Sequence, residues 1–95
     1  MNSEQALQTY LLRQASYYAI YARKVQAVGH TGFPDVFLSH GSRVALVEIK
    51  SPTGRGELSK KQELEISRIE ESGTKVYVIE NKEEADYVIA QFADA

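Results

Sequence analysis

Residues 43–50 of this chain can be buried on both faces, which leaves few folds open to it. Their sequence, RVALVEIK, is apolar at positions 44 to 47 and again at position 49. A half-exposed strand shows a polar residue at every second position, whereas a strand covered on both sides reads as a nearly continuous apolar run. The segment therefore predicts a central strand with helices packed on both faces of its sheet.

The remaining residues alternate between helical and extended patterns. Apolar residues recur at helical spacing near the N-terminus. Ser59 followed by Gln62 forms a possible capping box at the start of a second helix, and Gly73 suits the left-handed residue that ends it. The patterns predict helices at 3–17, 59–72 and 82–92, and strands at 21–28, 36–38, 43–50 and 75–79. Residues 17–22 could instead extend the first helix.

The order of these elements is helix, three strands, helix, strand, helix (αβββαβα). A helix between the strands at 43–50 and 75–79 requires a crossover connection, so these two strands should be parallel and adjacent. The expected fold is of the α/β class, a mixed β-sheet flanked by helices. With 95 residues the chain fits one domain, residues 1–95.

Composition excludes several classes of protein. The chain has no cysteine, no apolar stretch of membrane-spanning length and no secretory signal pattern, so we expect a cytoplasmic protein with no membrane partner. The net charge of −2 argues against a basic coat protein of nucleic acid. Residues 1–61 nevertheless carry eight Lys/Arg against four Asp/Glu, and residues 62–95 carry three against nine. The first part could face phosphates, although unevenly charged helix surfaces explain the asymmetry equally well.

Two charged residues stand in the segment where charge is least expected. Glu48 and Lys50 are two positions apart, so both side chains point to one face of the strand. Because a buried charge is costly without a partner, the pair needs a ligand or a counter-charge. A lone Glu-x-Lys more often lies at an exposed strand end. Asp35 favours a site here, because a hairpin between residues 36–38 and 43–50 places it beside Glu48 or Lys50.

Two carboxylates that converge at strand ends make an oxygen-rich site suited to Mg²⁺ or Mn²⁺. Asp35 and Glu48 are the candidate metal ligands, and the main-chain carbonyl of Ile49 is a further one. A metal polarises a phosphate and activates water, while a lysine such as Lys50 positions the water and stabilises developing charge. These parts are the ones that hydrolysis of a phosphodiester requires.

The same residues carry a family resemblance. Residues 32–35 (GFPD) followed by residues 47–50 (VEIK) resemble the signature of PD-(D/E)XK nucleases, and are similar in particular to the virus-type replication–repair nuclease (VRR-NUC) domain. That pattern comprises a Gly-x-Pro-Asp turn, a Glu-x-Lys strand, a loop with glycine and a helix with a glutamine. This chain has Gly54 and Gly56 in the loop and Gln62 in the helix, so the match spans nearly the whole chain.

The resemblance implies a restriction-endonuclease-like fold and an Mg²⁺- or Mn²⁺-dependent endonuclease acting on DNA. Stand-alone members are phage proteins that resemble Holliday-junction resolvases of DNA repair and act as homodimers. The same domain occurs at the end of the Fanconi-associated nuclease. For this chain the resemblance implies a set of catalytic residues and one more metal ligand, Glu4 on the first helix. The catalytic set is Asp35, Glu48, Lys50 and Gln62. A phage-encoded protein would act in the host cytoplasm on branched DNA.

Each secondary residue also has a purely structural explanation. Glu4 is a first-turn acid of the kind that the helix dipole favours. Gln62 completes the capping box, and both of its roles can coexist. Arg55, Lys60 and Lys61 are natural phosphate contacts in a DNA-binding protein, or else a solvated basic segment.

Three tyrosines and two histidines complete the candidates. Tyr17, Tyr18 and Tyr21 offer more aromatic surface than one helix end needs, which favours a homodimer interface over packing on the chain's own sheet. His30 and His40 lack the spacing of a zinc or general-base site, so neither receives a role. Two other functions stay open, a non-catalytic nucleic-acid-binding module and a structural subunit that retains the nuclease fold.

Overall fold

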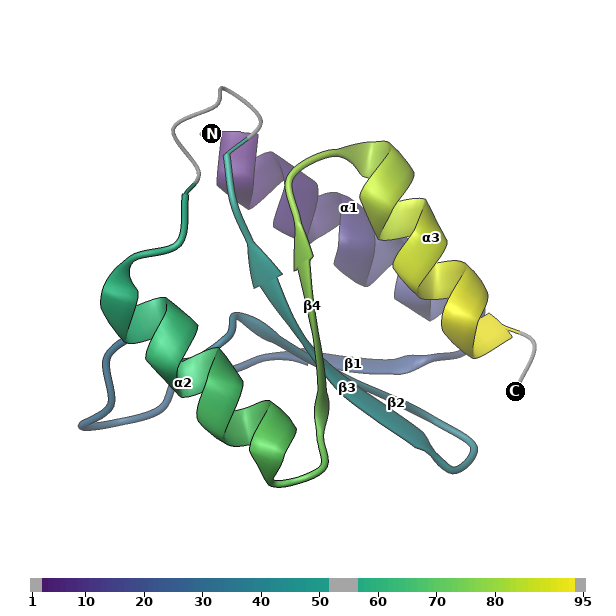
Figure 1. The fold of residues 1–95 in the computed structure, drawn as a ribbon. Helices are drawn as coiled ribbons and strands as arrows, with labels where there is room; N and C mark the ends of the chain where they lie inside the picture. The colour runs from purple at the N-terminus through teal and green to yellow at the C-terminus, as the bar shows by residue number, and fades with distance from the viewer. Residues whose placement is uncertain (1–2, 52–56, 94–95) are drawn as a thin grey trace.

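A four-stranded mixed sheet forms the centre of the molecule (Figure 1). The computed structural model describes residues 3–51 and 57–93. The strands lie in the order β1 (Tyr21–Lys24), β2 (Val36–His40), β3 (Arg43–Ile49) and β4 (Lys75–Ile79). The pairs β1–β2 and β2–β3 are antiparallel and β3–β4 is parallel. The predicted α/β mixed sheet, the element order and the parallel crossover pair are therefore confirmed.

Helices cover both faces of this sheet (Figure 1). Helices α1 (Ser3–Tyr17) and α3 (Lys82–Ala93) pack together on one face, and α2 (Lys60–Glu71) lies on the other. The larger core cluster, under α1 and α3, contains Leu7, Leu11, Ala15, Ile20, Val36, Leu38, Ala45, Val47, Ile49, Ile79, Ala85, Val88, Ile89 and Phe92. The smaller cluster, under α2, is built on Leu46, Ile66 and Val76.

Strand β3 is buried on both faces from Ala45 to Ile49, as its composition predicts. Val44 at its start is 46% exposed, because it precedes the part that the helices cover. Ala45, Val47 and Ile49 point into the larger cluster, while Leu46 points toward α2. Burial of a side chain of this size stabilises the fold by roughly 1.5–3 kcal/mol. The side chain of Glu48 also points to the α2 face of this buried strand, and only 3% of the residue is exposed. The carboxyl of Glu48 is therefore placed in the interior by the burial of its apolar neighbours.

The first helix ends at Tyr17, which settles whether residues 17–22 continue it. Ala19 adopts a left-handed conformation with a φ of 60°. The amide of Ile20 then donates a 2.8 Å hydrogen bond to the carbonyl of Ala15, a pattern that closes helix C-termini. The side chain of Ile20 is buried in the larger cluster, and this burial offsets the cost of a left-handed alanine.

Two strand lengths differ from the sequence prediction. Strand β1 stops at Lys24 rather than Val28. The last backbone hydrogen bond from this segment to the neighbouring strand segment is donated by the Val25 amide to the carbonyl of Asp35 (2.8 Å). Strand β2 continues to His40, where His40 pairs with Arg43 across a turn at Gly41. Among residues 3–51 and 57–93 there is no helix with the length and hydropathy to cross a membrane.

Candidate active site

Asp35, directly before the inner strand β2, is held in place by three hydrogen bonds. Its amide donates to the carbonyl of Val47 (2.9 Å), and its carbonyl accepts from the amide of Val25 (2.8 Å). Its carboxylate oxygen Oδ2 accepts a 2.8 Å hydrogen bond from the amide of Ile49. This last bond spans the predicted hairpin and holds the Asp35 carboxylate against the carboxyl end of β3. The sequence predicts Asp35 beside Glu48 or Lys50, and the strand register places it beside Glu48.

Glu48 is the one buried charged residue in the described part of the chain. Its Oε2 atom accepts a 3.0 Å hydrogen bond from Gln62 Nε2. Its Oε1 atom is buried and receives no hydrogen bond from any described residue. The pKa of the Glu48 carboxyl is raised from 4.5 to about 8, with burial away from water as the largest cause and the nearby negative charge of Asp35 as the second. Positive charge from Lys50 works in the opposite direction without cancelling these effects.

Gln62 joins the helix cap to the charged cluster. Its Oε1 atom accepts from the amide of Ser59 (2.9 Å), while Ser59 Oγ accepts from the amide of Gln62 (3.1 Å). The predicted capping box is thus confirmed. The same Oε1 also accepts from Lys50 Nζ at 3.2 Å. One amide side chain therefore caps α2 and contacts both Glu48 and Lys50, so that the two roles considered for Gln62 coexist.

Lys50 directly follows the last residue of β3. Its ammonium Nζ is 3.9 Å from Glu48 Oε2, and 12% of its side chain is exposed. The amide of Lys50 donates to the carbonyl of Ile79 in the parallel neighbour β4 (2.8 Å). Both the backbone and the ammonium are therefore held, and little rotamer freedom is left for the side chain.

A small pocket opens beside these residues. It has a volume of about 190 Å³ and is lined by Glu4, Gln5, Gln8, Asp35 and Ile49. At this pocket the first turns of α1 lie next to the Asp35–Ile49 hydrogen bond. Sequence reasoning missed Gln8, although its position four residues after Glu4 places both on one face of α1.

The oxygen atoms of Asp35 and Ile49 at this pocket, together with the neighbouring Glu48, could hold Mg²⁺ or Mn²⁺. No three carboxylate, imidazole or thiol side chains among residues 3–51 and 57–93 gather closely enough to hold an ion by themselves. Mg²⁺ does not require such a cage, since it is usually held by one or two carboxylates and keeps several waters. Asp35, Glu48 and the carbonyl of Ile49 could supply that smaller set, and the buried Glu48 Oε1 is an acceptor still without a partner among the described residues.

Of the remaining predicted residues, the structure describes Glu4, Lys60 and Lys61. Lys60 and Lys61 are exposed on the first turn of α2, next to Gln62. Arg55, Gly54 and Gly56 lie outside the described residues. Glu4 lines the pocket, and its negative charge adds a small upward contribution to the pKa of Glu48.

Comparisons with known proteins agree with this geometry. The family model for the VRR-NUC domain matches residues 2–83. This chain belongs to the VRR-NUC family. A search of curated proteins found no match. The family assignment confirms the resemblance seen in the two sequence motifs and shows that this VRR-NUC domain has a nuclease-type fold.

Two solved structures support the fold of the VRR-NUC domain. One, named VRR_NUC domain, superposes with a TM-score of 0.84 at 21% identity and covers 97% of this chain and 99% of its own. Another, named VRR_NUC domain protein, has a TM-score of 0.77 at 17% identity, with 97% of this chain and 88% of that chain covered. At these identities the likeness concerns the backbone, so the roles of individual side chains rest on the geometry above.

Proposed function

We propose that this VRR-NUC domain is a metal-dependent endonuclease that hydrolyses phosphodiester bonds in DNA. The observation that carries the proposal is the buried Glu48 carboxyl, which converges with Asp35 at a strand end while Lys50 stands 3.9 Å away. A module that only binds nucleic acid gains nothing from two carboxylates, because they repel phosphate. A purely structural subunit has no need of two carboxylates that converge. A hydrolytic site gains a place for a divalent cation.

Asp35, Glu48 and the carbonyl of Ile49 would hold the cation, Mg²⁺ or Mn²⁺, and Glu4 would reach it from α1 across the pocket. When bound there, the ion supplies a concentrated positive charge next to the phosphate that is attacked. The ion also requires Glu48 to be ionised, so the proton that burial favours must leave on binding.

The chain's own groups complete the proposed site. Lys50 would stabilise negative charge on the phosphate and orient the attacking water, because its ammonium is already held at Gln62 Oε1. Gln62 acts on Lys50 and Glu48 together through its two amide atoms. Lys60 and Lys61, exposed at the start of α2, would contact neighbouring phosphates, and Arg55 is proposed for the same role.

Cleavage should require Mg²⁺ or Mn²⁺ and should stop in excess chelator. The assay uses the purified protein with a labelled four-way DNA junction and a linear duplex of the same sequence. Ca²⁺ should bind the oxygen site and support little turnover, because its looser coordination positions water poorly. Robust cleavage in chelator would rule out the mechanism, and tight DNA binding without cleavage in any metal would favour the non-catalytic binding module.

The proposed substrate is branched DNA, such as a Holliday junction, and the proposed active form is a homodimer. A two-fold pair of sites suits two strands that must be cut symmetrically. Tyr17 and Tyr18 support the dimer, because their rings meet edge to face at 5.2 Å on the surface and not in the core. Tyr21 is exposed as well but does not join them, since its ring packs against Phe37 on the α2 side of the sheet. Exposed fractions are 80% for Tyr17, 48% for Tyr18 and 53% for Tyr21.

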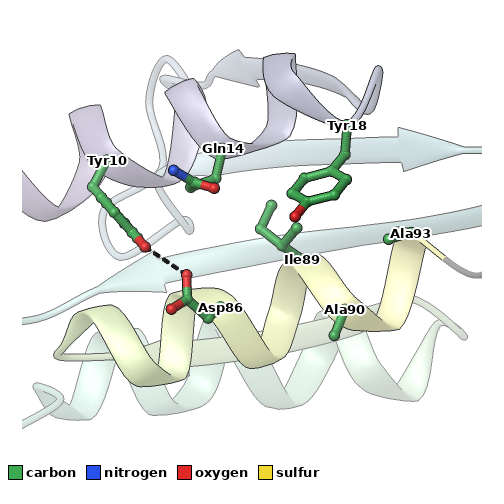
Figure 2. A pocket seen from close by; sticks show the side chains of 7 residues that line it. All are labelled: Tyr10, Gln14, Tyr18, Asp86, Ile89, Ala90 and Ala93. Carbon is green, nitrogen blue, oxygen red and sulfur yellow. Dashed lines mark hydrogen bonds between the residues drawn. The ribbon is translucent and has the colours of Figure 1, made fainter.

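A surface hollow extends from Tyr18 between α1 and α3 (Figure 2). It has a volume of about 350 Å³, and Tyr18 and Ile89 form its apolar end. At its other end Tyr10 donates a 2.7 Å hydrogen bond to Asp86 Oδ1. A hollow with an apolar end beside an exposed aromatic ring is the kind of surface that a second subunit covers.

Sedimentation equilibrium at micromolar concentration should give twice the 10.6 kDa mass of one chain. Tyr18→Asp should shift the protein toward monomer, since it places a charge in the hollow. Tyr87→Asp is the matched control, because Tyr87 is also an exposed tyrosine (60%, on α3) but does not line the hollow. A wild-type mass near one chain would contradict the dimer. A dimer that survives Tyr18→Asp would show that another surface forms the interface.

A further inference from the structure

Gly32 makes an unusually close approach to the first turn of α2. Its φ is +92°, a conformation that residues with side chains rarely adopt. A Cβ atom on Gly32 would lie 2.9 Å from the carbonyl oxygen of Lys61 and 3.0 Å from the amide nitrogen of Gln62. Both neighbours are backbone atoms of a helix, so they cannot move aside as a flexible side chain would. The loop before β2 and the start of α2 are therefore in direct backbone contact at this point.

The helical turn that Gly32 touches is the one that carries Gln62. Gln62 Nε2 donates to Glu48 Oε2 at 3.0 Å, and Gln62 Oε1 accepts from Lys50 Nζ at 3.2 Å. Both partners lie at the end of β3, so these two bonds are sensitive to the separation between α2 and β3. A displacement of the turn by a few tenths of an ångström would lengthen both.

The other end of the same loop is bound to β3. Asp35, three residues after Gly32, receives the hydrogen bond from the Ile49 amide and donates its own amide to Val47. Pro34 is fully buried, and Phe33 packs against the cluster under α2. Residues 32–35 thus form a short, firmly held spacer between the first turn of α2 and the end of β3.

We propose that Gly32 is a positioning residue of the active site, which sets the distance from α2 to β3 so that Gln62 holds Glu48 and Lys50 together. Its importance for cleavage rests on the proposed nuclease function. The positioning itself is a property of the free protein and can be measured without DNA or metal.

Gly29 provides a matched control for the test. It lies in the same loop with a φ of +79°, and a Cβ atom there would meet no described residue within 4 Å. Gly29→Ala and Gly32→Ala therefore impose a similar backbone strain, whereas only Gly32→Ala places a methyl group against α2. Differences between the two variants report the contact with the helix rather than the loss of a flexible glycine.

The first measurement is NMR of the metal-free protein. Wild-type protein should show a nuclear Overhauser effect between the Gly32 α-protons and the Gln62 backbone amide. The side-chain amide signals of Gln62, assigned by their loss in Gln62→Ala, should shift in Gly32→Ala and stay in place in Gly29→Ala. If Gly32→Ala is unfolded, trimethylamine N-oxide is added to favour its folded state. Absence of the Overhauser effect, or unshifted Gln62 signals in folded Gly32→Ala, would overturn the proposal.

The second measurement is steady-state cleavage. Gly32→Ala should lower kcat by about tenfold to a hundredfold, with KM for DNA little changed, as expected when catalytic groups are displaced by a fraction of an ångström. Gly29→Ala should retain the wild-type kcat. Because Gly32 acts through Gln62, the double variant Gly32→Ala/Gln62→Ala should be no slower than Gln62→Ala alone. A further loss in the double variant would contradict a role through Gln62. Wild-type protein without cleavage would refute the nuclease function and leave the NMR test valid.

Discussion

Glu48→Gln should lose detectable cleavage and keep its fold. The substitution removes the buried carboxylate proposed to bind the metal but preserves the shape of the side chain and the acceptor for Gln62 Nε2. The new amide group can also donate a hydrogen bond to the Asp35 carboxylate, as a protonated Glu48 would. Removing one such charged group from an active site typically costs about 10²-fold or more in rate. The check is single-turnover cleavage in Mg²⁺ together with circular dichroism and thermal unfolding.

Asp35→Asn should give the same loss for a related reason. Asparagine retains an oxygen that can accept the hydrogen bond of the Ile49 amide, so the turn before β2 should persist. Glu71→Gln serves as the control for both variants, since it makes the same change of charge at an exposed carboxylate at the end of α2, where it accepts a hydrogen bond from Ser67. Wild-type rates in either site variant, or an equal loss in Glu71→Gln, would remove the central claim of the nuclease proposal.

The metal-free protein should become less stable as the pH rises from about 4.5 to about 8. The folded state raises the pKa of Glu48 from 4.5 to about 8, so within this window it binds a proton that the unfolded chain has released. Stability from this group is fully present below pH 4.5, and it is lost as the pH rises through the folded-state value. Above pH 8 both states are ionised, and the contribution no longer changes.

Urea unfolding in chelator, at several pH values between 4.5 and 9, measures this effect. The wild-type unfolding free energy should fall relative to that of Glu48→Gln across the window, since other titrating groups are common to both proteins. A difference of only about 1 kcal/mol would move Tm by ~4–8 °C in a domain of this size. Asp35→Asn should shrink the effect, because the Asp35 charge is one cause of the raised pKa. If the unfolding free energies of wild-type protein and Glu48→Gln changed in parallel with pH, the raised pKa of Glu48 would be refuted.

Much of the fold was predictable because its signals are local. Ser59 and Gln62 form a capping box with each other, so spacing alone identified the start of α2. The apolar run at residues 43–50 marked β3, and the helix that follows required a parallel partner at 75–79. Strand ends were less predictable, as for β1, because a strand ends where its neighbour's backbone stops offering hydrogen bonds.

The candidate site was predictable as a set of residues but not as an arrangement. Alternation along β3 placed Glu48 and Lys50 on one face, and the hairpin placed Asp35 beside them. Gln62 was recognised as a helix cap and from the resemblance. Its contact with both Glu48 and Lys50 depends on where α2 docks, which no spacing within the helix encodes.

Sequence by itself determined the elements, their order and the chemical groups available at the end of β3, because propensity, capping and periodicity act over a few neighbouring residues. Tertiary structure alone decided the burial that raises the pKa of Glu48, the pocket shared with α1, and the close approach of Gly32 to α2. Each of these depends on distances between segments that are remote in the chain. Such distances follow from how the two helical layers pack on the sheet, so they emerge only when the whole core forms.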